Sequence, residues 1–469
     1  MKKIVAVAAL MALSVLPARA HHPEYSSYQD LIGIVAEWQA MGATIYVPAT
    51  SENGRAVYLV EVGTGPITIL YSNVLHAEEP SGSEAFIRFV YALLGDMGPT
   101  FAHEVLPGVV PGAPLYAALA DPAARAALLA RVKIVGFPMM DPDGFDNNHT
   151  RDFMANTDYA TKITEQSAAL EWAVETFEPD LYLDSHGGPD SPDLNIGLVE
   201  PIATEPATLS QSRRAAETSW RVAAGIGASV AYFEEHIFEI ILGTHDEPFA
   251  SADETYWTSI SKGLPVTQAS YQLEGLPAVY TETVGLQSVD PSISISAGAS
   301  AQQTVMAGLA FEAAGMLTGQ VPQKTLDEPA TGRVIELATA ATDFYAAVRW
   351  KLSGQDYELR LVDDAGAVVA GSGFDAAHPA TAGSRSRAIE VASLPAGRYT
   401  LEAIPRIPLV DDDSTLRAVW RTADPNPWSL GEIADADADV RLCLSGTAYG
   451  DLMRSSDVTA GLASRRCPD

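Results

Sequence analysis

The chain has 469 residues, which is longer than one typical domain, and 47% of them are hydrophobic, enough for ordinary buried cores. Lysine and arginine number 29 against 60 aspartates and glutamates, which gives a formal net charge of −31. A field of that sign repels nucleic acid and anionic membrane surfaces, so we expect neither to be a partner.

The first twenty residues have the features of a secretory signal. Lys2 and Lys3 form the charged start, residues 4–16 are apolar, and residues 18–20 offer a small-residue cleavage site. The apolar segment is shorter than the roughly 20 residues that span a bilayer, and no later segment is long enough. We therefore expect a signal peptide over residues 1–20, no membrane span, and export to the periplasm or the medium.

Strand-like and helix-like patterns alternate between about residue 30 and residue 320. Runs rich in branched residues predict strands, and apolar residues at a 3.6-residue period predict helices. The expected strands cover 57–62, 67–71, 133–137, 180–184 and 277–283, and the expected helices cover 84–94, 122–132, 164–177, 210–225 and 302–317. This alternation predicts an α/β fold in which helices flank a mixed, mostly parallel central sheet. We assign it to a first domain over residues 21–322.

The pattern changes near residue 319. Residues 319–330 are polar and contain two prolines, which is typical of a linker. Short alternating runs then follow, separated by turn signals, over 334–337, 357–362, 388–391 and 399–403. They predict a β-sandwich domain over residues 323–430.

The last segment, residues 431–469, contains both cysteines of the chain, Cys443 and Cys467. An even number of cysteines in an exported chain favours a disulfide between them. Two unrelated buried thiols are the alternative.

Two of the predicted strands are followed by histidines. His76 and Glu79 come after the strand at 67–71, and His186 comes after the strand at 180–184. Ligands of such sheets gather beyond the carboxyl ends of the strands, so we expect the three side chains to meet there. Two imidazoles and a carboxylate with an open fourth position are the ligand set of a catalytic zinc site, which predicts one Zn²⁺ per chain. A loop ion pair and a buried, hydrogen-bonded histidine are the alternatives without a metal.

His236 and Glu239 have the same spacing as His76 and Glu79. No strand is evident before this second pair, and no acidic turn follows it at the right distance. We therefore expect the pair to lie on a helix face or a loop wall.

Four motifs occur in the order found in one enzyme family. They are His76-x-x-Glu79, Asp141-Pro142-Asp143-Gly144, His186 and Tyr280-Thr281-Glu282-Thr283. With them the chain resembles the zinc carboxypeptidases of the carboxypeptidase A type over roughly residues 30–320. The resemblance implies that the first and third motifs bind zinc and that the second forms a turn beside the site.

The resemblance also implies roles for residues outside the ligand set. Glu282 would be the general base, because a carboxylate near zinc can take a proton from water and pass it to the leaving amine. Arg151 would stabilise the oxyanion, and Asn156 and Tyr256 would bind substrate. For Glu282, a surface glutamate at a strand end is the alternative.

One segment departs from the family pattern, in which an aspartate, an asparagine and an arginine recur as Asp-x-Asn-Arg. Our preferred alignment places Asn156 on the asparagine, but Met154 replaces the aspartate and Thr157 replaces the arginine. Threonine cannot form a bidentate pair with the terminal carboxylate of a peptide. An alternative alignment over residues 151–153 puts Arg151 in the carboxylate-binding place.

These observations predict a zinc-dependent metallopeptidase of the carboxypeptidase type, acting on a peptide or peptide-like substrate. A zinc amidase or deacylase, or a cell-wall peptide hydrolase on the same site, is the first alternative. A non-catalytic, zinc-containing binding protein is the second.

Overall fold

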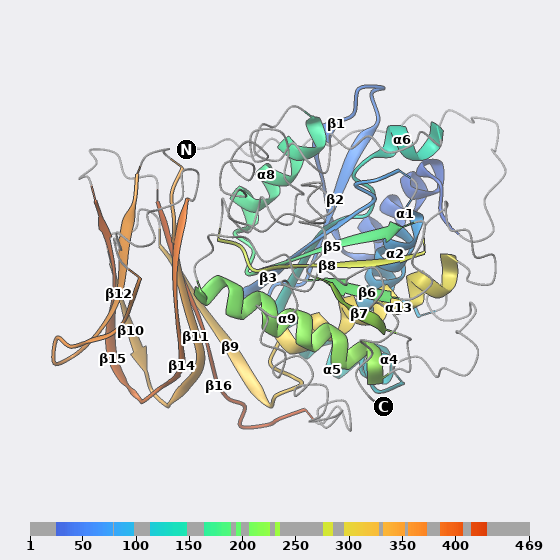
Figure 1. The fold of residues 1–469 in the computed structure, drawn as a ribbon. Helices are drawn as coiled ribbons and strands as arrows, with labels where there is room; N and C mark the ends of the chain where they lie inside the picture. Colours follow the sequence, from blue (N-terminus) through green and yellow to red (C-terminus); the bar gives the residue numbers. More distant parts are fainter. Residues whose placement is uncertain are drawn as a thin grey trace, which may run out of the picture.

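The computed structural model describes residues 25–77, 79–97, 113–147, 164–188, 194–197, 206–225, 230–234, 275–284, 295–327, 332–351, 355–372, 385–406 and 414–428. They form an α/β part and, beside it, a part made of two antiparallel sheets (Figure 1). The signal peptide and the cysteine pair predicted from the sequence lie outside the described residues.

A mixed sheet is the centre of the α/β part. Its strands are β1 (Thr44–Thr50), β2 (Ala56–Val62), β3 (Ile67–Asn73), β4 (Val132–Phe137), β5 (Leu181–Gly188), β6 (Leu194–Gly197), β7 (Val230–Glu234) and β8 (Ala278–Val284). The spatial order is β1-β2-β4-β3-β5-β8-β6-β7. The four central strands β4, β3, β5 and β8 run parallel, so their carboxyl ends share one edge. The predicted α/β class with a mixed, mostly parallel sheet is confirmed.

Helices cover both faces of this sheet. They are α1 (Tyr28–Met41), α2 (Pro80–Leu94), α4 (Ala113–Ala120), α5 (Pro122–Arg131), α6 (Pro142–Asn147), α8 (Glu165–Phe177), α9 (Pro206–Gly225) and α13 (Ile295–Ala313). Side chains alternate along each strand, so Ile69 and Tyr71 pack with α2 and α13, while Leu70 packs with α8 on the opposite face. Because both faces are covered, the central strands are almost wholly buried.

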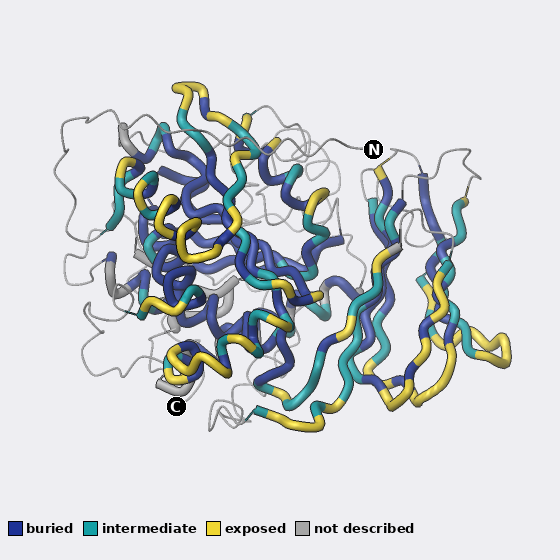
Figure 2. The backbone as a smooth tube through the Cα atoms, turned by 180° about the vertical axis from the view of Figure 1, so that it is seen from behind, coloured by how far each residue is buried: buried dark blue, intermediate teal, exposed yellow. Residues whose placement is uncertain are grey.

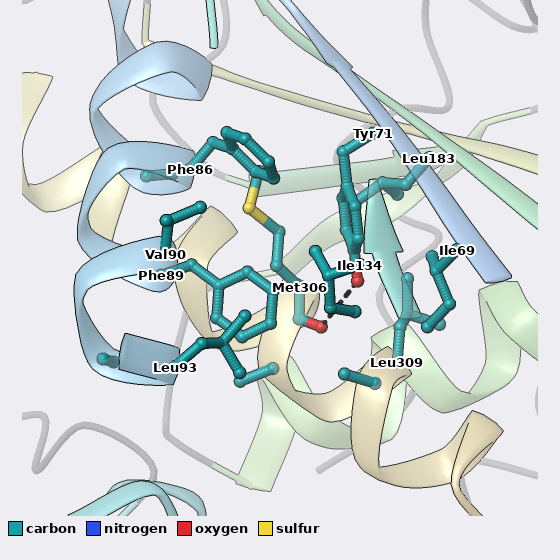
Figure 3. Packing of buried hydrophobic residues seen from close by; sticks show 14 of the residues in the cluster. Ile69, Tyr71, Phe86, Phe89, Val90, Leu93, Ile134, Leu183, Met306 and Leu309 are labelled. Carbon is teal, nitrogen blue, oxygen red and sulfur yellow. Dashed lines mark hydrogen bonds between the residues drawn. The ribbon is translucent and has the colours of Figure 1, made fainter. Parts of the chain in front are cut away.

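The larger core lies between the sheet and the helices α2 and α13 (Figure 3). Phe86 and Phe89 of α2 pack against the ring of Tyr71, with ring centroids 5.6 and 5.9 Å apart. The Tyr71 hydroxyl donates to the Met306 carbonyl of α13 at 3.1 Å, so this buried phenol is satisfied. The core thereby ties β3, which leads to His76, to both helices.

Several helix boundaries follow from their capping residues. Asp121 caps α5 with Pro122 at the first helical position, and Thr164 caps α8, so these helices begin at or within one residue of the expected starts at 122 and 164. The predicted helix over 302–317 is shifted, because α13 begins at Ile295 and ends at Ala313. α1 was not predicted, although Ser27 and Asp30 form a capping box at its start.

The second part of the structure is a β-sandwich. One sheet has the order β10 (Arg333–Leu337), β15 (Gly397–Pro405), β12 (Tyr357–Asp363) and β13 (Val368–Ser372), and the other has the order β14 (Ser386–Leu394), β11 (Ala341–Arg349), β16 (Thr415–Ala423) and β9 (Gln320–Asp327). Buried residues of both sheets, such as Leu359 and Val348, form one common core. This confirms the predicted C-terminal sandwich.

The linker predicted over residues 319–330 is wrong in its central portion. Residues 320–327 form β9, which pairs antiparallel with β16, so the expected boundary at 322/323 falls inside a strand. Pro322 is tolerated there because β9 is an edge strand of its sheet.

The sandwich packs on the α/β part through the sheet that contains β9, β11, β14 and β16. Tyr345, Ala347 and Ala388 on the outer face of this sheet form a small buried cluster with Ala207 of α9. In Figure 2 the buried residues are concentrated in the α/β layers and along parts of the sandwich strands, and exposed residues lie on the outer turns of helices and at strand connections. Among the described helices, none has the length and apolar content needed to cross a membrane.

Candidate metal centre

The loop that carries His76 leaves the sheet at the end of β3 and is anchored by backbone hydrogen bonds. Met140 N donates to Asn73 O and Asp141 N donates to Val74 O, both at 2.9 Å. Val74 has φ +57°, a left-handed conformation that is uncommon for a β-branched residue. The backbone therefore turns sharply just before His76.

The acidic turn at 141–144 lies directly against this loop. Asp141 Oδ1 accepts from Gly144 N at 2.9 Å, and a Cβ on Gly144 would lie 2.8 Å from the Ala77 Cβ and 2.3 Å from Asp141 Oδ2. Only glycine allows this approach. The motif thus supports the loop between His76 and Glu79.

Glu79 immediately precedes α2, which begins at Pro80 rather than at residue 84 as expected. Proline at the first helical position fits, because that N–H has no partner inside a helix. The partial positive charge of the helix N-terminus favours an ionised carboxylate at this place.

The three predicted ligands come together at the carboxyl edge of the parallel strands. His76 Nδ1 lies 2.7 Å from Glu79 Oε1, and His186 Nδ1 lies 3.0 Å from Glu79 Oε2. One possible ligand atom from each residue lies within 4.8 Å of the others, and all three residues are buried. No other such group of histidine, cysteine or acidic residues occurs in the part of the chain that the structure describes.

The electrostatics of the cluster favour a cation. Burial by itself would raise the pKa of the Glu79 carboxyl, but the neighbouring His76 and His186 lower that pKa to about 2. Burial would lower the pKa of His186, but Asp184 and Glu79 raise it well above its usual value. Two buried carboxylates thus draw positive charge to this point, and two imidazoles with one carboxylate are a donor set that fits zinc.

Further polar residues surround His186 and were not predicted. Asp184 Oδ2 accepts from His186 Nε2 at 2.8 Å, and Gln302 Nε2 donates to the His186 carbonyl at 2.7 Å. The sequence signal for Asp184 was its place two residues before His186, which puts both side chains on the same face of a strand. Gln302 had no such signal.

Glu282 lies in β8, where its backbone is in register with His186 of β5. It also pairs with Asn195 of β6. The predicted base thus occupies the strand position next to the predicted ligand His186, while its side chain lies outside the described residues.

The other predicted site residues, Arg151, Asn156 and Tyr256, lie outside the described residues, as do His236 and Glu239. The expectation that no strand precedes His236 and Glu239 is wrong, because β7 ends at Glu234, two residues before His236.

No protein-family model matches this sequence, and no curated protein does. Solved structures of carboxypeptidases are similar to the chain. A metallo-carboxypeptidase from Burkholderia cenocepacia is 17% identical, with a TM-score of 0.43, over 61% of this chain and 68% of that one. One from Pseudomonas aeruginosa, in complex with (2-guanidinoethylmercapto)succinic acid, is 16% identical, with a TM-score of 0.42, over 61% and 68%. Carboxypeptidase A from Helicoverpa armigera is 13% identical, with a TM-score of 0.40, over 62% and 74%.

The similarity predicted from four sequence motifs is thus found in the structure comparison as well. At these identities and scores it assigns no activity to the chain. The residues of the site and their contacts support the function proposed below.

Proposed function

We propose that this protein is an exported, zinc-dependent metallopeptidase that hydrolyses peptide bonds. The observation that carries the proposal is the buried cluster of His76, Glu79 and His186 at the carboxyl edge of the parallel sheet. Burial of two histidines and a carboxylate without a cation is unfavourable, whereas the same set with one side left open is typical of catalytic zinc.

In this proposal one zinc ion is held by His76, Glu79 and His186. Bound there, zinc would act as a Lewis acid that polarises a carbonyl and acidifies water. Glu282, at the strand position beside His186, would accept a proton from water and return it to the leaving amine. Arg151 would stabilise negative charge on the carbonyl oxygen.

The substrate in this proposal is a peptide or peptide-like amide, positioned by Asn156 and Tyr256. Thr157 stands where the preferred alignment expects an arginine for the terminal carboxylate. With that arginine missing, the competing substrate class is an amide or a cell-wall peptide that lacks a free C-terminal carboxylate.

The test is hydrolysis of a mixed peptide library by zinc-loaded protein, with products identified by mass spectrometry. Glu282→Gln keeps the size of the side chain and removes the base, so we expect turnover to fall by about 10²–10⁴-fold. Glu336→Gln, on an exposed strand position of the sandwich, is the matched control and should leave turnover unchanged.

Different products separate the candidate functions. Loss of single C-terminal residues supports a carboxypeptidase and the alignment that gives Arg151 the carboxylate. Cleavage restricted to N-acyl or amide bonds, sensitive to Glu282→Gln, supports the amidase or cell-wall hydrolase. A protein that binds zinc but turns over neither substrate class would overturn the catalytic proposal in favour of a binding function.

A further inference from the structure

A chain of buried hydrogen bonds runs along one face of the sheet behind His186. Tyr182, Asp184 and His186 alternate along β5 and therefore point to the same face. Ser72 of β3 lies opposite Asp184 in the parallel register. The Tyr182 hydroxyl lies 2.6 Å from Ser72 Oγ, Ser72 Oγ is hydrogen-bonded to Asp184 Oδ1, and Asp184 Oδ2 lies 2.8 Å from His186 Nε2.

The chemistry of the groups fixes which atom donates and which accepts in each of these hydrogen bonds. An ionised carboxylate only accepts, so both Ser72 Oγ and His186 Nε2 donate to Asp184. Ser72 has one hydroxyl proton and gives it to Asp184, so Tyr182 donates to Ser72. A proton of His186 is thereby held on Nε2, and the ring is oriented so that Nδ1 faces Glu79 Oε2, 3.0 Å away.

The hydrogen-bonded residues behind His186 are fully buried, which restricts their geometry. Ser72, Tyr182 and Asp184 are all 0% exposed. A buried carboxylate is costly unless it is hydrogen-bonded, so these donors stabilise Asp184 in its buried position. Gln302 holds the backbone carbonyl of the same histidine, so both the ring and the main chain of His186 are fixed.

We infer that Tyr182, Ser72 and Asp184 form a positioning relay that presents His186 Nδ1 to a divalent metal ion. The inference rests on the proposed function only in taking His186 as a metal ligand. A carboxylate on the far nitrogen of a ligating imidazole fixes its tautomer and orientation and makes it a stronger ligand. None of the three residues touches substrate in this scheme.

The relay is tested by zinc affinity, measured by competition with a chromophoric chelator. Asp184→Asn keeps the shape and removes the charge, so we expect binding to weaken by about 10–100-fold. Ser72→Ala and Tyr182→Phe remove more distant members and should weaken zinc binding by smaller, graded factors. ¹⁵N NMR of the histidine rings in the zinc-loaded proteins gives a second readout, in which the His186 Nε2–H signal should shift between wild type and Asp184→Asn, because its acceptor changes from a carboxylate to an amide.

Tyr71→Phe is the matched control. It also removes one buried hydroxyl from the sheet, but among the described residues the Tyr71 hydroxyl bonds to Met306 O on the opposite face of the sheet from Asp184. Tyr71→Phe and Tyr182→Phe should lower the free energy of unfolding by similar amounts, because each removes one buried hydrogen bond, while only Tyr182→Phe changes zinc affinity.

The outcomes distinguish the relay from the proposed function. If wild type binds no zinc, the proposed function fails and the relay with it. If wild type binds zinc and all three relay variants bind it equally well, the relay alone is overturned. If Asp184→Asn fails to fold, the zinc affinities of Ser72→Ala and Tyr182→Phe, compared with that of Tyr71→Phe, still test the relay.

Discussion

Gly82 allows the first turn of α2 to lie directly against β5. A Cβ at this position would lie 2.9 Å from the Ser185 Cβ and 3.1 Å from the Ser185 carbonyl oxygen. Glu79 comes just before this turn and His186 just after Ser185. The contact therefore sets how closely the Glu79 carboxylate approaches the His186 imidazole.

We expect Gly82→Ala to push α2 away from β5 by a few tenths of an ångström. The free energy of unfolding should fall by about 1–3 kcal/mol from overpacking, and zinc affinity should fall with it. Gly33→Ala is the control, because Gly33 lies on the exposed side of α1 with nothing within 4 Å of a new Cβ. That substitution should stabilise the protein by about 0.5–1 kcal/mol. Wild-type zinc affinity in Gly82→Ala would contradict this account.

At the scale of elements, the turn between α8 and β5 is held by cations of the sandwich. Lys324 of β9 donates to Glu178 O at 2.9 Å and to Asp180 Oδ2 at 2.8 Å. Arg417 of β16 bonds to Pro179 O, and Arg349 of β11 pairs with Glu178. Burial lowers the pKa of Lys324, while Asp180 raises it, so the pairing offsets only part of the cost of desolvation.

Breaking a buried pair on one side is expected to be more harmful than removing both partners. Lys324→Met should lower the free energy of unfolding by about 3 kcal/mol, because Asp180 loses its nearest cation. Adding Asp180→Asn should restore about half of that loss. Lys351 and Glu175 make the control pair, also 2.8 Å apart and also joining sandwich to α8, but with side chains 51% and 40% exposed. Urea unfolding of Lys351→Met should show a change in the free energy of unfolding under about 1 kcal/mol. Equal effects of the two lysine variants would show that burial does not strengthen the Lys324–Asp180 pair.

The elements that were predictable from the sequence carry local signals. The 3.6-residue apolar period predicted α5 and α8, and runs of branched residues predicted the central strands. The ligands followed from strand ends, since topology places the ends of parallel strands together. β9 was missed because its pairing with β16 lies about 95 residues away in sequence, and the Ser72–Asp184 contact joins residues 112 apart. Such contacts depend on tertiary register, which local patterns do not contain.

For the whole molecule, the described contacts of the sandwich with the sheet lie at the edge opposite the metal centre. Asp180, just before β5, pairs with Lys324, and Gly275, just before β8, accepts from the Tyr345 hydroxyl at 3.2 Å. His76 and Glu79 follow the carboxyl end of β3, and His186 lies near the carboxyl end of β5. Arg421 of β16 pairs with Glu312 of α13 at 2.9 Å, and Arg131 at the end of α5 pairs with Asp424 after β16 at 2.6 Å. The described contacts of the sandwich thus support the strands that carry the predicted ligands at the ends away from those ligands.

The pair of Arg131 and Asp424 gives this docking a pH dependence. Burial would raise the pKa of Asp424, but its hydrogen bonds from Arg131 and from Asn426 N lower it below its ordinary value. A carboxyl whose pKa is lower in the folded state stabilises that state above the unfolded pKa, and the contribution is lost as pH falls through the folded pKa. We expect Asp424→Asn to lower the free energy of unfolding by about 1 kcal/mol at pH 7, and the difference from wild type to shrink below about pH 4. Urea unfolding of both proteins between pH 3 and pH 7 measures this, and a difference that stays constant over that range would mean that the ion pair contributes nothing to the docking of the sandwich.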